Sequence, residues 1–136
     1  MEKQPIVILT HNGWGTELIK SVKMIVGSIE NVHEVALKAE DSLTDYLDRV
    51  KEQIEKLKWD KNLLILTDIK GGTPSNVALR LSKDYDIVAV SGLCAAMLLE
   101  SVSRQEGKGF TKEMANDIRQ IVVDSCQVLE LPTINN

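Results

Sequence analysis

The sequence lacks the features that would direct it to a nucleic acid, a membrane or an oxidising compartment. Its 16 lysine and arginine residues are outnumbered by 20 aspartate and glutamate residues, and no basic stripe is present, which argues against a nucleic-acid partner. No apolar run approaches the ~20 residues of a membrane-spanning helix, and no signal-peptide pattern opens the chain, so we expect a cytoplasmic location. The two cysteines, Cys94 and Cys126, do not have the spacing of metal ligands. We expect them to be small buried hydrophobic residues rather than a disulfide.

The size and composition that remain are those of one folded domain. The chain has 136 residues, so we expect residues 1–136 to form a single domain. Hydrophobic residues make up 43% of the chain and charged residues 26%, which is typical of a soluble globular protein. A chain of this size buries enough surface to fold without cross-links.

Two stretches of the sequence repeat one design. Residues 6–11 read IVILTH and residues 63–68 read LLILTD, so each has an apolar run, then a threonine, then one titratable residue. A short apolar run bounded by turn residues is typical of a strand buried on both faces, as in a parallel sheet. Neighbouring parallel strands end at the same edge of a sheet. We therefore expect His11 and Asp68 to lie together at the edge where open α/β sheets bind their ligands.

The rest of the chain alternates strands with helices. We expect strands from residue 6 and over residues 32–37, 63–67 and 86–92. Helices are expected over residues 16–26, 93–102 and from the N-caps Ser42, Thr73 and Thr111, the last helix ending near residue 125. This order requires an open, mainly parallel α/β sheet of four strands with helices on both faces. The helix faces expected to be buried carry Leu18, Ile19, Val22, Ile25 and Val26; Leu43, Tyr46, Leu47, Val50, Ile54 and Leu57; Val77, Leu79 and Leu81; and Met114, Ile118, Ile121, Val122 and Ser125.

His11 and Asp68 together have the chemistry of a histidine that accepts a phosphoryl group. A neutral imidazole attacks phosphorus through one ring nitrogen while the other nitrogen carries the proton. A carboxylate that accepts a hydrogen bond from the protonated nitrogen fixes the tautomer and stabilises the developing positive charge. We therefore expect His11 to be the nucleophile and Asp68 to orient it. Trp14, in the loop after His11, covers the site, faces a partner or packs in the core.

The segment after Asp68 is suited to binding a phosphate. Gly71 and Gly72 let the backbone approach an anion closely, and Thr73 adds a hydroxyl donor at the start of a predicted helix. Free N–H groups and the helix dipole favour an anion there. Lys70 either adds positive charge or points to solvent. Taken singly, a histidine at a strand end, an aspartate and a Gly-Gly turn are ordinary structural features, so their combination carries the functional prediction.

The loop at His11 and residues 68–76 (DIKGGTPSN) resemble the enzyme IIA component of the mannose–fructose–sorbose family. These proteins are cytoplasmic phosphocarriers, and thus phosphotransferases, of the bacterial phosphoenolpyruvate:sugar phosphotransferase system. The family motif D-x-x-G-G-[ST]-P-x-N is matched at every specified position, and the resemblance covers nearly the whole chain. It implies that His11 is the phosphorylated histidine, that Asp68 orients it and that Thr73 helps hold the phosphate. The one departure is Asn12, where the family usually has glycine, although asparagine tolerates left-handed backbone angles better than most residues.

The same resemblance implies the fold and the partners. The family fold is a parallel sheet of four strands, with a fifth, antiparallel strand exchanged between the subunits of a homodimer. Residues 128–131 are the candidate for that edge strand. The phosphoryl group would come from the phosphorylated histidine-containing phosphocarrier protein and pass to the IIB component, and through it to the membrane permease components. No metal ion and no organic cofactor is implied.

Three other functions share parts of this pattern. A receiver domain would be phosphorylated on Asp68, but it needs an acidic pair after the first strand, where this chain has Thr10 and His11. A phosphocarrier subunit of a dihydroxyacetone kinase shares the fold, although residues 71–74 match the sugar-transport branch. A IIA-like regulatory domain of a transcriptional activator fits the sequence as well as a transport component does.

Overall fold

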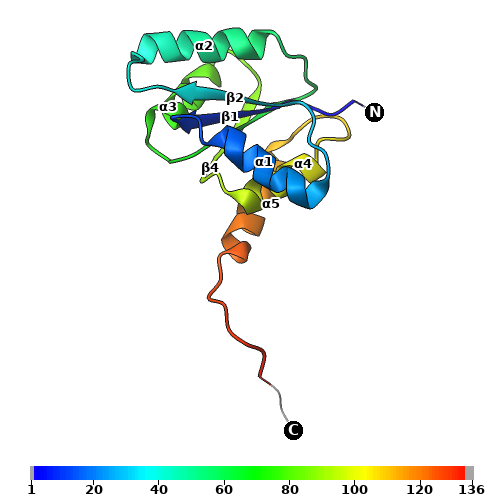
Figure 1. The fold of residues 1–136 in the computed structure, drawn as a ribbon. Helices are drawn as coiled ribbons and strands as arrows, with labels where there is room; N and C mark the ends of the chain where they lie inside the picture. The colour runs from blue at the N-terminus through cyan, green and yellow to red at the C-terminus, as the bar shows by residue number, and fades with distance from the viewer. Residues whose placement is uncertain (1, 134–136) are drawn as a thin grey trace.

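A four-stranded parallel sheet forms the centre of the computed structural model, which describes residues 2–133 (Figure 1). Its strands are β1 (Ile6–His11), β2 (Val32–Leu37), β3 (Leu63–Thr67) and β4 (Ile87–Ser91). They lie in the order β2-β1-β3-β4, and every neighbouring pair is parallel, which confirms the predicted sheet. From β1 the chain first adds β2 on one side and then β3 and β4 on the other side. The topological switch point therefore lies between β1 and β3.

Five helices cover the sheet within the described part of the chain: α1 (Gly15–Val26), α2 (Leu43–Glu55), α3 (Thr73–Leu81), α4 (Ala95–Ser103) and α5 (Lys112–Ser125). Helices α2 and α3 pack on one face of the sheet, and α1, α4 and α5 pack on the other (Figure 1). None of the helices among residues 2–133 has the length and apolar character needed to cross a bilayer. The helices expected on both faces are confirmed.

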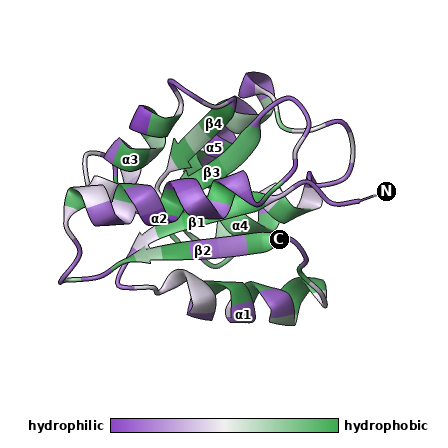
Figure 2. Ribbon diagram, turned by 90° about the horizontal axis from the view of Figure 1, so that it is seen from above, coloured by the Kyte–Doolittle hydropathy of each residue, from purple (hydrophilic) through white to green (hydrophobic). Residues whose placement is uncertain are grey.

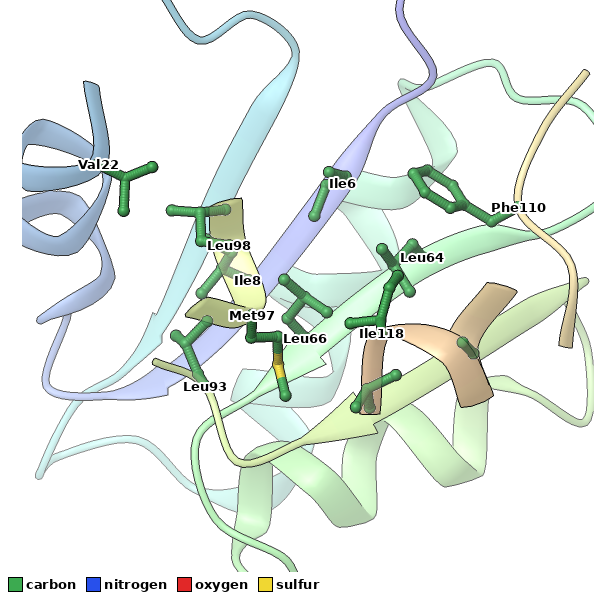
Figure 3. Packing of buried hydrophobic residues seen from close by; sticks show 12 residues of the cluster. Ile6, Ile8, Val22, Leu64, Leu66, Leu93, Met97, Leu98, Phe110 and Ile118 are labelled. Atoms are coloured by element: carbon green, nitrogen blue, oxygen red, sulfur yellow. The ribbon is translucent and has the colours of Figure 1, made fainter. Parts of the chain in front are cut away.

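Both faces of the central strands are buried. Along β1, Ile6 and Ile8 belong to one hydrophobic cluster, and Val7 and Leu9 belong to the other. The first cluster packs under α1, α4 and α5, as Figure 3 shows for Val22, Leu98 and Ile118 around the β1 and β3 side chains. Figure 2 shows mostly hydrophobic central strands beneath a largely hydrophilic outer surface of α2. Burial on both sides explains why these strands are continuous apolar runs rather than alternating ones.

The start of α3 differs from the prediction by one residue. Gly72, with φ −80° and ψ 168°, is the N-cap, and Thr73 is the first helical residue. The carbonyl of Gly72 accepts the first helical hydrogen bond, from the N–H of Asn76 at 3.0 Å. Extended backbone angles and that first bond define an N-cap. The predicted caps Ser42 and Thr111 are confirmed, since their side chains accept from the N–H groups of Asp45 and Met114.

Several residues expected to be buried are exposed instead. Leu79 lies about 200° around α3 from Val77 and so faces away from the sheet. The other exposed residues lie in the first turn of α2, the last turn of α1 or the end of α5, which projects beyond the sheet (Figure 1). These residues are Leu43, Ile25, Val26, Ile121 and Ser125, together with Cys126 directly after α5. Cys94 is half-buried, and both thiols are free.

The segment after α5 does not join the sheet of its own chain. Residues 127–133 form no strand, and Val128, Leu129 and Leu131 are 85%, 93% and 93% exposed. Figure 1 shows this segment leaving the body of the protein as an extended chain. Residues 128–131 therefore pair with no strand of their own chain, and the predicted exchange of this segment between subunits stays a prediction.

Candidate active site

The pairing of β1 with β3 brings His11 and Asp68 together. Leu9 lies opposite Thr67, so the two titratable residues follow at the same edge of the sheet. The backbone N–H of His11 donates to Oδ2 of Asp68 at 2.7 Å, and Nδ1 of the His11 ring lies 2.8 Å from the same oxygen. The other oxygen, Oδ1, accepts from the N–H of Ile69 at 2.9 Å. Two backbone donors therefore fix the carboxylate that holds the imidazole.

The Asp68 carboxylate is buried whereas the His11 ring is accessible. The Asp68 side chain is 3% exposed and the His11 side chain 46% exposed. Burial raises the pKa of Asp68, but hydrogen bonds from the backbone and ring of His11 and from Ile69 outweigh it, so the pKa lies below its ordinary value. An ionised carboxylate can only accept, so Nδ1 is the nitrogen that carries the proton. The lone pair of Nε2 is then left free.

The edge of the ring that carries Nε2 lies over the start of α3. A methyl group built on Gly72 would be 3.0 Å from Cε1 of His11 and 3.6 Å from Nε2. The N–H groups of Thr73 and Ser75 have no acceptor among residues 2–133, and Pro74 between them has none to offer. A helix N-terminus with free N–H groups favours an anion. The nucleophilic edge of the histidine and an anion-binding helix end therefore lie side by side.

The other residues predicted for the phosphate site lie in the turn before α3. Gly71 has φ +85°, a left-handed angle that reverses the chain after Ile69. Thr73 is partly buried, and its hydroxyl is not engaged by any described residue. Lys70 is exposed on the turn. The structure thus gathers Gly71, Gly72 and Thr73 beside His11 and leaves Lys70 at the solvent-facing side.

The backbone conformation of the loop after His11 is one that asparagine at position 12 can adopt. Asn12 and Gly13 have φ +64° and +86°, so two consecutive residues are left-handed. Asparagine adopts this conformation more readily than most residues, which makes it an adequate replacement for glycine. The N–H of Asn12 donates to the carbonyl of Leu37 at 2.8 Å. Trp14 is the N-cap of α1 and is 41% exposed, so it lies at the surface of this loop rather than in the core.

Sequence reasoning gave no role to Ser75 or Glu34, which both support the site. The Ser75 hydroxyl donates to the carbonyl of Ile69 at 2.6 Å and lies 2.6 Å from Oγ1 of Thr67, so it fastens the turn around Asp68. Glu34 accepts hydrogen bonds from residues on both sides of the His11 loop. The available signal was a polar residue on a face expected to be buried: Ser75 toward the sheet in α3, and Glu34 within the apolar run of β2.

Two kinds of site are disfavoured by this arrangement. Both oxygens of Asp68 are occupied by donors from His11 and Ile69, and the side chain is buried, which argues against phosphorylation of Asp68 as in a receiver domain. Among the residues that the structure describes, no group of three or more histidine, cysteine, aspartate or glutamate side chains could hold a metal ion.

Comparison with known proteins gives consistent matches. The sequence model of the family described as "PTS system fructose IIA component" matches residues 5–121. The chain is 33% identical over 115 residues to the mannose-specific EIIAB component of Escherichia coli K12, covering 81% of this chain and 35% of that protein. It therefore spans about a third of the length of that curated relative. It is 25% identical over 124 residues to the fructose-specific EIIA component of Bacillus subtilis 168, covering 90% of this chain and 84% of that protein.

Solved structures of similar fold include another IIA component. The mannose/sorbose specific IIA subunit from Enterococcus faecalis superimposes with a TM-score of 0.86 at 27% identity, covering 98% of this chain and 100% of that chain. A sigma-54 interaction domain protein from Enterococcus faecalis has a TM-score of 0.75 at 12% identity, with 90% of this chain and 92% of that chain covered. At that identity the second likeness shows a shared fold alone.

The contact between Gly72 and the His11 ring can be tested by Gly72→Ala. The new methyl group would meet Cε1 at 3.0 Å, closer than the ring tolerates without moving. We expect the NMR resonance of the ring proton on Cε1 to shift. Gly71→Ala is the matched control, because its methyl group has no neighbour within 4 Å while its φ is +85°. The control should lose about 1–2 kcal/mol of unfolding free energy without moving that resonance. An unmoved resonance in Gly72→Ala would place the ring elsewhere.

Proposed function

Since the chain belongs to the IIA-component family of the sugar phosphotransferase system, we propose that His11 is its phosphorylated residue. One observation carries the proposal: Asp68 holds Nδ1 of His11 at 2.8 Å, while the edge with Nε2 adjoins the N-terminus of α3. The nucleophilic nitrogen is thus unprotonated, accessible and next to donors for an incoming phosphoryl group.

In the proposed reaction, the lone pair of Nε2 attacks the phosphorus of a phosphohistidine on the donor protein. The new Nε2–P bond forms as the P–N bond of the donor breaks, and the donor imidazole keeps that electron pair. Nδ1 retains its proton, so the phosphorylated ring of His11 is positively charged, and the Asp68 carboxylate stabilises this charge. The free N–H groups of Thr73 and Ser75 and the Thr73 hydroxyl supply donors to the phosphoryl oxygens. A nucleophile on an acceptor protein then removes the group by the same displacement.

The partners follow from the family. We assign the donor role to the phosphorylated histidine-containing phosphocarrier protein and the acceptor role to the IIB component, both in the cytoplasm. This makes the chain a protein-histidine phosphotransferase in sugar uptake. The regulatory alternative is not favoured, because the likeness to a sigma-54 interaction domain protein is one of fold at 12% identity. The accessible His11 ring is suited to reach a second protein, as transfer between carriers requires.

We also propose that the chain forms a homodimer in which residues 128–131 add to β4 of the partner. At the β2 edge of the sheet, Arg49 of α2 donates to the carbonyl of Ala36 at 2.8 Å and so occupies part of the edge. The β4 edge pairs on one side only within residues 2–133. An added strand can therefore pair with β4.

Two hollows flank that open edge. One of about 240 Å³ lies on the α3 side, lined in part by Ser75, Ala78, Leu79, Ala89 and Ser91. The other, of about 260 Å³, lies on the α5 side, lined by Ala89, Val90, Ser91, Ala115, Asn116 and Arg119. Alternate side chains of an added strand would point into the two hollows in turn. The exposed apolar residues Val128, Leu129 and Leu131 are suited to fill them.

The role of His11 is tested by His11→Ala. The protein should fold normally, because the ring is nearly half exposed, and should accept no phosphate. Each variant is incubated with phosphoenolpyruvate, enzyme I and the histidine-containing phosphocarrier protein, and its intact mass is measured. The unaltered protein and the control His33→Ala should each gain one phosphoryl group. Phosphorylation of His11→Ala would contradict the mechanism.

The dimer is tested by removing every residue after Cys126. The full chain should sediment as a dimer at micromolar concentration, and the truncated chain should dissociate because β4 loses its added strand. Circular dichroism should show the same helix content in both, since α5 ends at Ser125. A full chain that sediments as a monomer, or a truncated chain that associates as strongly, would rule out this mode of pairing.

A further inference from the structure

The carboxylate of Glu34 holds both ends of the loop that carries His11. Its Oε2 accepts from the hydroxyl of Thr10 and from the N–H of Gly15, the latter at 2.7 Å. Its Oε1 accepts from the N–H and the hydroxyl of Thr16, at 2.9 and 2.7 Å. Thr10 directly precedes His11, and Gly15 and Thr16 begin α1. One side chain of β2 therefore binds the residues directly before and directly after the loop of residues 11–14.

Glu34 replaces a cap that α1 lacks. The N-cap residue, Trp14, has no side-chain acceptor for the first N–H groups of the helix. Glu34 supplies that acceptor from the neighbouring strand, and its negative charge suits a helix N-terminus. A methyl group built on Gly15 would lie 2.4 Å from Oε2 of Glu34 and 3.1 Å from Cγ2 of Ile8. The carboxylate thus occupies the space that any side chain at position 15 would need.

The loop between these two ends needs such support. Asn12 has a left-handed backbone angle, with φ +64°, which in a residue other than glycine persists where the surroundings enforce it. The N–H of Asn12 is bound by the carbonyl of Leu37, and its carbonyl accepts from Lys38 at 3.4 Å. His11 itself is held by Asp68, and Glu34 ties together the two ends of the loop.

We propose that Glu34 is a positioning residue for His11: it holds the backbone on both sides of His11, while Asp68 holds the N–H and the ring of His11 itself. The proposal rests on the function proposed above for His11. Glu34 fixes Thr10 and the start of α1, and this keeps Nδ1 at 2.8 Å from Asp68 and Nε2 over α3. Loss of the hydrogen bonds to Glu34 misplaces the nucleophile, His11, without removing any group that touches the phosphoryl donor. Its effect therefore falls on the transfer step rather than on donor binding.

Glu34→Gln is the sharpest test. The amide keeps the size of the side chain, but its NH₂ group must face either the Gly15 N–H or the Thr16 N–H, so one backbone donor is left unsatisfied in either orientation. We expect the transfer rate at saturating phosphorylated phosphocarrier protein to fall about 10- to 100-fold, as misplacement by a fraction of an ångström to one ångström does. The donor concentration at half-maximal rate should not change. Glu52→Gln, which alters an exposed carboxylate of α2, is the control and should transfer normally.

A second readout does not depend on transfer. Nitrogen-15 NMR of the unphosphorylated protein reports which ring nitrogen of His11 carries the proton, and Glu34→Gln should lose the fixed Nδ1–H form. If the unaltered protein accepts no phosphate, the proposed function fails, yet the NMR comparison still tests the positioning. If Glu34→Gln does not fold, Thr16→Val provides a milder test, because it removes the hydroxyl that donates to Oε1 of Glu34. It should lower the transfer rate and the share of the Nδ1–H form in the same direction as Glu34→Gln, but by less. A Glu34→Gln protein that is only less stable, with unchanged transfer rate and His11 tautomer, would reduce Glu34 to a helix cap and overturn the proposal.

Discussion

The parallel pairing of β1 with β3 is the constraint on which the site depends. The apolar residues of both strands are fully buried on both faces, and Leu9 lies opposite Thr67. A shift of this register would draw the polar residues that flank the apolar runs into the buried part of the sheet, so burial favours the observed pairing. Because the two strands are parallel and end together at the switch point, the same packing sets Asp68 beside His11. The geometry of the site is thus a consequence of the core.

Different parts of the site orient the His11 ring and offer donors to an anion. Asp68 holds Nδ1, and its lowered pKa means that it stays ionised until the pH falls through that pKa, where its stabilising hydrogen bonds to His11 are lost. Backbone N–H groups at the start of α3 provide donors for an anion, and Gly72 leaves room for the ring. Neither task needs a metal ligand or a flexible charged side chain. Such a preorganised arrangement suits a phosphocarrier, which must accept and release its group readily.

The sequence alone predicted the features that a local pattern of residues determines. It missed the contacts that depend on how separate strands and helices align. The apolar runs ending in Thr10-His11 and Thr67-Asp68 predicted both strands and their meeting, because burial on both faces leaves a clear signature. The face of α3 that carries Leu79 was misjudged, since a nine-residue helix gives too little periodicity to locate its apolar stripe. The contact of Glu34 with Gly15 depends on how β2 aligns with β1, which no local pattern records.

The position of the phosphoryl group on His11 shows whether Asp68 orients the ring. The protein is phosphorylated by the phosphorylated phosphocarrier protein and denatured in alkali, and its phosphorus NMR spectrum is compared with the two phosphohistidine isomers. Since Asp68 occupies Nδ1 and the free edge of the ring adjoins α3, we expect the Nε2 adduct. An Nδ1 adduct would show that Asp68 does not orient His11.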